Sequence, residues 1–451
     1  MKIVSLNLEN TGLEIKDLCK KLVEEADEEL ILIVEPREDA VKILSDAALS
    51  RISEEEAIEK LAAELNNLSR GIAEENKRIV EAEIVESLNK ISEYLRAEKK
   101  AGGATPKGIS LMLNTLCNTI TIIVSNHFKS LGKDAKWLTA GQAGFTLIED
   151  YELPWSHYVS LSKPEELRKA LTGILVLSGR VCFDKQGNET NLRKGMGSVI
   201  AILVANEIGV KEVYVPKANG GVYTADPNIV ENARVIPSLS YAEALELSRL
   251  GEWFVSPQAV ELAEELGVRI LVTNIKSPFK ESTIIGFEKA VEKQIVKAVA
   301  MIPDMSILTV EGAAMAGTPG VASAILGEVA KRGVSICMIS QDASEVGITL
   351  VVRDADLERA LKGLREGFSR ERIVKRIRIQ RNVAVISAVG EGMRGTRGVA
   401  ARIFSAVAEA GVNVLAIAQG SSETSISFVV LMEDAKKAVK AVHDKVILGI
   451  Q

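Results

Sequence analysis

The residues best suited to chemistry lie in a short glycine-rich stretch, RKGMGS, at residues 193–198. Gly195 and Gly197 let the chain turn and let backbone N–H groups approach a bound group, because neither residue carries a Cβ atom. Lys194 adds a positive charge beside them. Backbone N–H groups combined with a cation are suited to binding an anion. The stretch is therefore a candidate anion site.

Cysteine and histidine residues do not cluster anywhere in the sequence. There is no CxxC pair and no Cys/His group with the spacing of a zinc site, so the sequence predicts no metal site. Widely spaced cysteines are typical of buried, reduced thiols in a cytosolic protein. The residues concerned are Cys19, Cys117, Cys182, Cys337, His127, His157 and His443.

The C-terminal part of the chain contains an internal repeat. Residues 315–352 and 393–430 align without a gap, 78 positions apart. Each copy reads as a strand, a glycine-rich turn, a helix and two strands, and matching helices are expected at 354–366 and 434–445. Two side-by-side copies of a βαββαβ module account for this pattern. Tight strand-to-helix turns, with or without a ligand, explain the glycines Gly317, Gly320, Gly395 and Gly398.

The first part of the chain, up to about residue 290, alternates apolar strand-like runs with amphipathic helical stretches. This alternation predicts an α/β fold with a largely parallel sheet and helices on both faces. The clearest predicted strands are 31–34, 173–177, 212–215 and 269–272, and the clearest predicted helices are 241–250 and 256–266.

Residues 53–100 are rich in glutamate and lysine, with apolar residues at helical spacing. This pattern predicts two or three helices, arranged as a hairpin at the edge of the domain. The following stretch, AGGATP at residues 101–106, predicts a loop.

The overall charge excludes several classes of partner. The 451 residues carry a net charge of −6, which argues against duplex DNA and anionic membranes as partners. No apolar run approaches the roughly 18 residues of a membrane span. Asn7 and Glu9 come too early for a secretory signal. We therefore expect a cytoplasmic protein with no nucleic-acid or membrane partner.

A dense basic run, RERIVKRIRIQR, covers residues 370–381 between the two repeat copies. The simpler interpretation is a strand and linker whose basic side chains face water. The alternative is a contact with an anion or a partner protein.

Taken together, these motifs resemble the aspartokinase family. Residues 220–251 are similar to the family segment that packs around ATP, and Tyr223 and Asp226 match positions that contact the nucleotide. Both repeat copies resemble the family's amino-acid-sensing ACT modules, especially SSETSISFVV at residues 421–430. The resemblance covers essentially the whole chain.

The resemblance implies an amino-acid-kinase α/β/α sandwich at residues 1–295, in which residues 53–100 form a helical insertion. It also implies two α+β ferredoxin-like ACT modules, at 301–379 and 380–451. The reaction of the family transfers the γ-phosphoryl group of ATP to the β-carboxylate of aspartate. Mg-ATP is therefore the expected cofactor if the kinase site is functional, and positive charge is needed because donor and acceptor are both anionic.

Two expected active-site motifs are altered. Family members place a lysine, a phenylalanine and two glycines after the first strand, whereas this chain has SLNLE at residues 5–9. The family's Gly-Arg-Gly-Gly-Ser-Asp loop aligns with residues 193–198. There Lys194 stands at the arginine, without its bidentate geometry, and Ser198 stands at the aspartate expected to hold the substrate ammonium.

Three further positions depart from the family. PKA at residues 216–218 replaces Trp-Thr-Asp, Trp253 replaces a lysine, and the region of Cys117 lacks the expected glutamate. Each lost transition-state contact costs on the order of 10²–10³ in rate, so we assign no catalytic residue and expect little activity. Lys194 and Lys217 could still line the cleft. If a nucleotide binds, the resemblance implies contacts from Gly195, Gly197, Lys217, Gly221, Tyr223 and Asp226.

In ACT pairs of this family, an amino-acid effector is held by the turn after the first strand and by the second strand. Asn413 and Gln419 match that pattern, whereas Ser335 replaces a frequent Asn or Asp. The alternative is that Asn413 only turns the chain and the modules serve dimerisation. The implied effector contacts are Met315, Gly317, Ser335, Gln341, Met393, Gly395, Asn413 and Gln419.

Three functions agree with these observations. The first is a catalytically impaired regulatory or assembly subunit that senses an amino acid, lysine or threonine among the candidates, and pairs with an active aspartokinase. The second is an active kinase for aspartate or another acidic substrate, regulated through its ACT modules. The third is a homodimeric sensor without a kinase partner.

Overall fold

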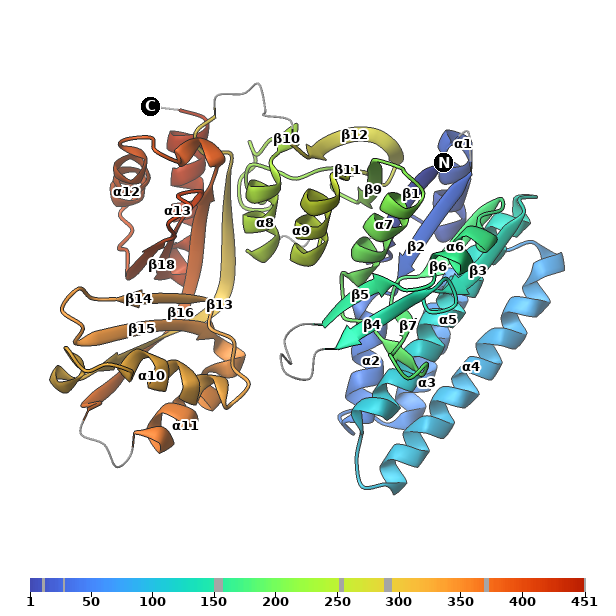
Figure 1. Ribbon diagram of the computed structural model, residues 1–451, viewed down its shortest axis with the longest axis horizontal. Helices are drawn as coiled ribbons and strands as arrows, with labels where there is room; N and C mark the ends of the chain where they lie inside the picture. The colour runs from blue at the N-terminus through green and yellow to red at the C-terminus, as the bar shows by residue number, and fades with distance from the viewer. Residues whose placement is uncertain are drawn as a thin grey trace. The chain divides into compact units, whose positions relative to one another are not determined.

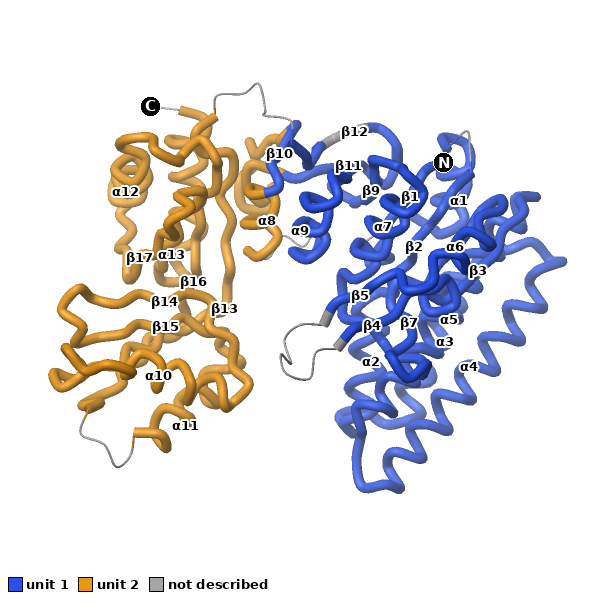
Figure 2. Tube along the Cα trace, viewed as in Figure 1, with its two compact units in different colours: residues 1–222, 237–241, 254–288 blue, residues 223–236, 242–253, 289–451 orange. Residues whose placement is uncertain are grey.

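The computed structural model describes two compact units, which are shown in Figure 1 and Figure 2. The first unit comprises residues 1–222, 237–241 and 254–288, and the second comprises 223–236, 242–253 and 289–451. The described residues are 1–9, 13–26, 29–149, 157–250, 255–287, 294–368 and 373–449.

The first unit is built on an eight-stranded sheet with the order β10-β12-β11-β9-β1-β2-β6-β3. Every pairing from β11 through β3 is parallel, and only the β11–β12 pairing is antiparallel. The predicted parallel sheet is therefore confirmed. The strands are β1 (Lys2–Asn7), β2 (Leu30–Glu35), β3 (Ala135–Thr139), β6 (Ile174–Ser178), β9 (Glu212–Lys217), β10 (Ser238–Leu239), β11 (Arg269–Asn274) and β12 (Ser277–Ile285).

Helices cover both faces of this sheet, as Figure 1 shows. On one face, Leu18, Leu61 and Met112 from three of the helices pack with Val4 and Leu32 of the central strands in one core. Helix α7 contacts β1, β2 and β9 and packs against α9. The helices are α1 (Ile15–Ala26), α2 (Glu38–Ala48), α3 (Glu54–Leu68), α4 (Glu74–Lys100), α5 (Pro106–Ser130), α6 (Pro164–Ala170), α7 (Met196–Glu207) and α9 (Pro257–Leu266).

The glutamate- and lysine-rich region forms the expected hairpin, made of helices α3 and α4. Helix α3 begins at a capped turn, because the Ser53 side chain accepts a hydrogen bond from the N–H of Glu56. Helix α5 begins in the same way, since Thr105 accepts from the N–H of Gly108 and Pro106 occupies the first helical position.

Helix α5 is long and apolar enough to cross a membrane by length and mean hydropathy alone. The expectation that no such stretch exists was wrong, because small uncharged residues such as Asn114 and Thr121 interrupt its apolar run without adding charge. Of its most apolar window, 72% is buried inside the protein. The helix therefore lies in the core of the first unit.

A second, four-stranded sheet in the first unit has the order β5-β4-β7-β8. None of the sequence patterns singled out this sheet, whose strands are only three to five residues long. They are β4 (Phe145–Glu149), β5 (His157–Leu161), β7 (Val181–Phe183) and β8 (Glu189–Asn191).

The second unit contains the two repeat copies on one six-stranded sheet, with the order β14-β15-β13-β16-β18-β17. All five pairings are antiparallel. The strands are β13 (Ala298–Glu311), β14 (Met338–Gln341), β15 (Gly347–Arg353), β16 (Arg376–Val389), β17 (Ala416–Gln419) and β18 (Ser425–Leu431). The helices are α8 (Tyr241–Arg249), α10 (Val321–Ala330), α11 (Leu357–Gly367), α12 (Val399–Glu409) and α13 (Met432–Val442).

The second module closes differently from the expected simple repeat. After helix α13 the described chain forms a π-helix at His443–Ile447 and no further strand. The fourth strand of the module is instead the first part of β13, where residues 298–302 pair with residues 385–389 of β16. Residues 305–311 of the same strand belong to the first module, where they pair with β15. The first module is thus inserted between two strands of the second.

Two segments from before residue 250 belong to the second unit. Glu243 of α8 and Lys297 form a buried ion pair with a separation of 2.7 Å. The same Glu243 carboxylate accepts a hydrogen bond from the N–H of Glu391 in the second module. This part of the chain is therefore tied directly to the second module.

The structure supports the simpler interpretation of the basic run at residues 370–381, a strand and linker whose basic side chains face water. Arg376 and Arg378 both form ion pairs with Glu311, and Arg381 forms one with Glu358. These arginines are more than half exposed to solvent. Residues 370–372 of the run lie outside the described part of the chain.

Candidate functional site

The candidate site of the first unit lies at the carboxyl edge of its parallel sheet. The chain passes from β1 to β2 on one side and returns to β9 on the other side of β1, so the strand order changes direction there. Ligands of α/β proteins bind at such switch points. Asn7, Glu35 and Lys217 are the last residues of β1, β2 and β9. The N-terminus of α7 packs against the same strands.

A carboxylate of the protein itself binds the N-terminus of α7. Glu35 accepts a hydrogen bond from the N–H of Gly195 at 3.1 Å and another from the N–H of Gly197 at 2.5 Å. Unpaired N–H groups and the helix dipole make a helix N-terminus an anion site. In this structure the N–H groups of the predicted anion site bind an anionic side chain of the protein itself.

The glycines of this loop make room for Glu35. Gly195 precedes the helix with a φ of +83°, a conformation that favours glycine. A Cβ atom at Gly197 would lie 2.7 Å from Oε1 of Glu35, which is too close. Both glycines thus have a structural role that requires no bound ligand.

Glu35 is 4% exposed, and this burial changes the pKa of its carboxyl group. Removal from water raises the pKa of this carboxyl above its usual range. The N–H groups of Gly197 and Gly195 oppose that rise, and so do the positive charges of Arg180 and Lys217. Burial lowers the pKa of Lys217 for the same reason, and the charge of Glu35 opposes this change. Each group thus favours the charged form of the other.

Lys194 and Ser198, which the resemblance placed at catalytic positions, both contact other side chains of the protein. Lys194 forms an ion pair with Glu9 at 2.9 Å, and both side chains are 38% exposed. Ser198 is buried, and its hydroxyl lies 3.1 Å from the hydroxyl of Ser5. Residues of the 5–9 stretch therefore contact residues of the 193–198 stretch.

Sequence reasoning missed Glu35, Arg180 and Glu38. Arg180 is 6% exposed; its Nε donates to the carbonyl of Leu192, and its Nη1 lies 3.3 Å from Oε1 of Glu38. One signal was available, because Glu35 directly follows the buried run LILIV, where a charged residue ends a strand. The edge of the sheet therefore carries three acids and three bases: Glu9, Glu35, Glu38, Arg180, Lys194 and Lys217.

The remaining predicted nucleotide contacts fall in different units. Gly221 belongs with Gly195, Gly197 and Lys217 in the first unit, whereas Tyr223 and Asp226 belong to the second. Trp253 lies outside the described residues.

The sequence of α5 around Cys117 contains no acid, whereas Glu35 and Glu38 of other segments lie close enough to act on the Cys117 thiol. Cys117 is buried in α5, where burial raises the pKa of its thiol to about 11. Its sulfur lies 3.9 Å from the side-chain nitrogen of Asn191. A neutral thiol at this place supplies no charge to a reaction.

A second candidate site lies at the glycine-rich turn of the first module. A cavity of about 370 Å³ brings together the predicted residues Met315, Gly317 and Gln341. Ser335 does not line this cavity and is exposed on the segment before β14. The other lining residues are Thr318, Pro319, Gly320, Val321, Ala322, Glu345 and Ile348.

In both modules, the glycine-rich turn donates a hydrogen bond to a glutamate carboxylate, and the two glutamates occupy equivalent positions of the repeat. The N–H of Gly317 donates to Glu345 at 2.8 Å, and the N–H of Gly395 donates to Glu423 at 2.7 Å. Glu345 and Glu423 have φ values of +58° and +55°, which are uncommon for a residue with a side chain. In the second module Met393 is buried, whereas Asn413 and Gln419 are exposed.

Among the described residues, no three Cys, His, Asp or Glu side chains form a group that could hold a metal ion.

Two family models match the chain. The amino acid kinase family matches residues 50–274, and the ACT domain matches residues 308–368 and 386–446. These matches agree with the two kinds of candidate site described above.

Curated relatives are aspartokinases. The chain is 32% identical over 273 residues to the bifunctional aspartokinase/homoserine dehydrogenase of Haemophilus influenzae, which covers 60% of this chain and 34% of the relative. It is 31% identical over 277 residues to aspartate kinase Ask_LysC of Stutzerimonas stutzeri, covering 60% of this chain and 65% of that protein. The chain thus spans about a third of the length of the bifunctional relative.

Solved structures share the fold over almost the whole chain. E. coli aspartokinase III in complex with aspartate and ADP matches with a TM-score of 0.79 at 19% identity, covering 98% of this chain and 99% of the other. The same enzyme in complex with lysine and aspartate matches with a TM-score of 0.76 at 19% identity, covering 99% of each chain. The α/β/α kinase-type domain followed by two ACT domains is thereby shown.

Proposed function

We propose that this chain, which belongs to the aspartokinase family, is a catalytically impaired member that senses an amino acid and acts as a regulatory or assembly subunit of the aspartate pathway. One observation carries the proposal. The carboxylate of Glu35 takes up the N–H groups of Gly195 and Gly197 at the start of α7, where an anionic substrate would need them.

The charge balance of the sheet edge supports the same proposal. Phosphoryl transfer to a carboxylate requires excess positive charge, because the donor and the acceptor repel each other. Here Glu9 pairs with Lys194, and Glu35 lies within the field of Lys217. The residues as arranged do not fit the phosphates of Mg-ATP, so no catalytic step is derived through that cofactor.

An assay of the purified chain tests the proposal. With Mg-ATP, aspartate and hydroxylamine, we expect no aspartyl-hydroxamate above background, while an active aspartokinase assayed in parallel gives a clear signal. Calorimetry with Mg-ATP should show no binding at millimolar concentration. Turnover on the order of one per second would overturn the proposal, since it is ordinary for an enzyme.

The sensing half of the proposal rests on the two ACT domains. Aspartokinase ACT domains bind amino-acid effectors, and one matched structure contains lysine. We propose lysine or threonine as the effector and either a homodimer through the ACT modules or a hetero-oligomer with an active aspartokinase. Calorimetry with each proteinogenic amino acid tests the first claim. Coexpression with a tagged active aspartokinase from the same source tests the second claim. A hetero-oligomer would co-purify with the tagged protein, whereas a homodimer would not.

An active aspartate kinase, feedback-regulated through its ACT modules, is the second candidate. It is favoured by the three bases at the sheet edge, Arg180, Lys194 and Lys217, which could bind phosphates if the acids beside them were displaced. Activity in the hydroxamate assay would support this candidate. In that case Lys217→Met should abolish activity, whereas the exposed Lys185→Met should not.

We further propose that the kinase-like domain covers residues 1–295, and that the ACT modules cover 301–379 and 380–451. We also propose a cytoplasmic location without nucleic-acid or membrane partners. The buried position of α5 supports this location.

A further inference from the structure

A cavity of about 430 Å³ lies wholly within the second unit, away from the glycine-rich turns. It follows β13 along residues 299–304 and is closed by side chains from four other segments. None of its lining residues belongs to the turn cavity of the first module. The other lining residues are Asp226, Ile229, Leu250, Arg353, Ala355 and Val439.

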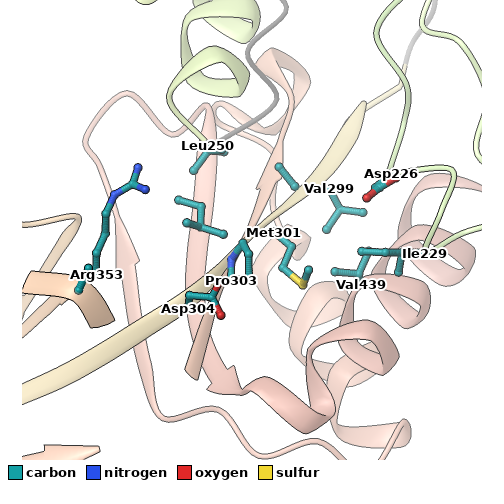
Figure 3. Close-up of a pocket in the computed structure, with 12 residues that line it drawn as sticks. Asp226, Ile229, Leu250, Val299, Met301, Pro303, Asp304, Arg353 and Val439 are labelled. Atoms are coloured by element: carbon teal, nitrogen blue, oxygen red, sulfur yellow. The ribbon is translucent and has the colours of Figure 1, made fainter. Parts of the chain in front are cut away.

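The middle of this cavity is apolar. Val299, Met301, Leu250 and Val439 line it, and Figure 3 shows Val299 and Met301 between the two ends. Apolar walls of this kind favour a ligand with a hydrocarbon middle, because such a ligand releases water when it binds.

Charged groups of opposite sign mark the two ends. Figure 3 shows Arg353 on one side of the cavity and Asp226 on the other. Asp226 already accepts from the N–H and side chain of Asn228 through Oδ1, which leaves Oδ2 for a ligand. Among the described residues, neither Arg353 nor Asp304 forms a side-chain hydrogen bond or ion pair. Asp304 also has a φ of +56°, a conformation that is uncommon outside glycine and often found at functional sites.

The register of the sheet gives the separation of the two ends. Arg353 pairs with Met305 of β13, and the N–H of Val299 donates to the carbonyl of Thr224, two residues before Asp226. Residues 299 and 305 would be about 20 Å apart in a fully extended strand, and the register shift between Ile302 and Met305 makes their separation shorter than that. The Arg353 and Asp226 side chains shorten this distance, and the remaining span suits about three extended residues, roughly 10 Å.

We propose that this cavity binds a short linear zwitterion, a peptide of about three residues with apolar side chains. Its carboxylate lies against the Arg353 guanidinium, its ammonium against Asp226, and its side chains along Val299 and Met301. A guanidinium binds a carboxylate in a bidentate geometry, which fixes the direction of the ligand. This inference goes beyond the proposed sensing of a single amino acid.

Other small ligands fit the cavity less well. An α-amino acid with an uncharged side chain carries both charges on one carbon atom, so it cannot meet Arg353 and Asp226 together. In lysine, the side-chain ammonium lies closer to the carboxylate than the roughly 10 Å that three extended residues span. A nucleotide would bring several negative charges to a cavity with two carboxylates, Asp226 and Asp304. The separation of the charges therefore selects a longer zwitterion.

Calorimetry with the tripeptide Ala-Leu-Ala on the full chain tests the proposal. We expect saturable binding that weakens at least tenfold when the peptide is acetylated at its N-terminus and at least tenfold when it is amidated at its C-terminus. Excess lysine or threonine should not compete. No saturable binding at millimolar peptide, or equal binding of the blocked peptides, would overturn the proposal.

Three variants locate the site. Arg353→Gln should lose preference for the free carboxylate, and Asp226→Asn should lose preference for the free ammonium, while each keeps the other preference. Arg402→Gln, at an exposed arginine of α12 outside the cavity, should bind like the wild type. Thermal unfolding of each variant establishes that it is folded. Folded Arg353 and Asp226 variants that bind the free and blocked peptides as the wild type does would disprove the assignment.

Discussion

At the sheet edge, side chains of the protein itself contact the start of α7. In the first motif, the acid Glu9 now pairs with Lys194, and at the end of β2 Glu35 accepts hydrogen bonds from the loop glycines. The N–H groups remain in place, but they stabilise the fold by binding an internal carboxylate. The proposed loss of substrate binding and the stability of the loop would thus have the same physical cause.

Replacement of Glu35 by glutamine should change how stability depends on pH. Burial raises the pKa of Glu35, so the folded protein holds a proton there more tightly than the unfolded chain does. This contribution is fully present below the usual Glu pKa and is lost as the pH rises through the raised pKa. Each unit of rise corresponds to about 1.4 kcal/mol. Glu35→Gln removes this titration.

Urea unfolding between about pH 4 and pH 8 measures the effect. The free energy of unfolding of the wild type, minus that of Glu35→Gln, should decrease as the pH rises. Glu81→Gln, at an exposed carboxylate of α4, should show a constant difference from the wild type. A wild-type advantage that grows with pH would contradict the prediction.

At the scale of single elements, the two modules use the same turn but pack their helices differently. In the first module, Gly363 of α11 lies close to α10, so that an added Cβ atom would be 2.5 Å from the carbonyl oxygen of Glu328. The position 78 residues later is Ala441 of α13. The helices of the first module therefore approach each other through a glycine that the second module does not need.

Two glycine-to-alanine substitutions in the first module should have opposite effects. Gly327→Ala in α10 should stabilise by about 0.5–1 kcal/mol, because its Cβ atom meets nothing and alanine favours the helix. Gly363→Ala should destabilise by about 1–3 kcal/mol, because it overpacks the helix pair. Denaturant unfolding of both variants measures the difference, and equal effects would show that the close approach is not a constraint.

At the scale of the whole molecule, the second unit presents two edge strands, β14 and β17. Ile339 and Ile417 stand at equivalent places on them and are 47% and 45% exposed. Unpaired backbone groups and exposed apolar side chains on an edge strand favour pairing with another chain. The proposed association through the ACT modules would cover both strands.

Light scattering after size exclusion tests this association. We expect a dimer for the wild type at micromolar concentration and a monomer for the double variant Ile339→Glu and Ile417→Glu, because a buried unpaired carboxylate opposes the interface. Ile79→Glu in α4 is the matched control, since Ile79 is 59% exposed on the first unit. A monomeric wild type, or a double variant that remains dimeric, would rule out these strands as the interface.

Local patterns in the sequence predicted many of the elements and their order, but not the four-stranded sheet of the first unit. Alternating runs predicted the parallel sheet, helical spacing predicted the α3–α4 hairpin, and the 78-residue repeat predicted the two modules. These features depend on residues that are close together in the chain. The spacing of apolar residues there indicates which face of a helix or strand is buried. The resemblance to the aspartokinase family, and not a periodic pattern, pointed to residues 193–198.

Only the tertiary structure decided which groups meet. Glu35 contacts Gly195 and Gly197 across 160 and 162 positions of sequence, and residues 298–302 complete a module whose other strands begin some eighty residues later. The cavity between Arg353 and Asp226 also joins distant segments. Such contacts follow from the order of the strands and from the burial of charged groups, and no local pattern in the sequence predicts them.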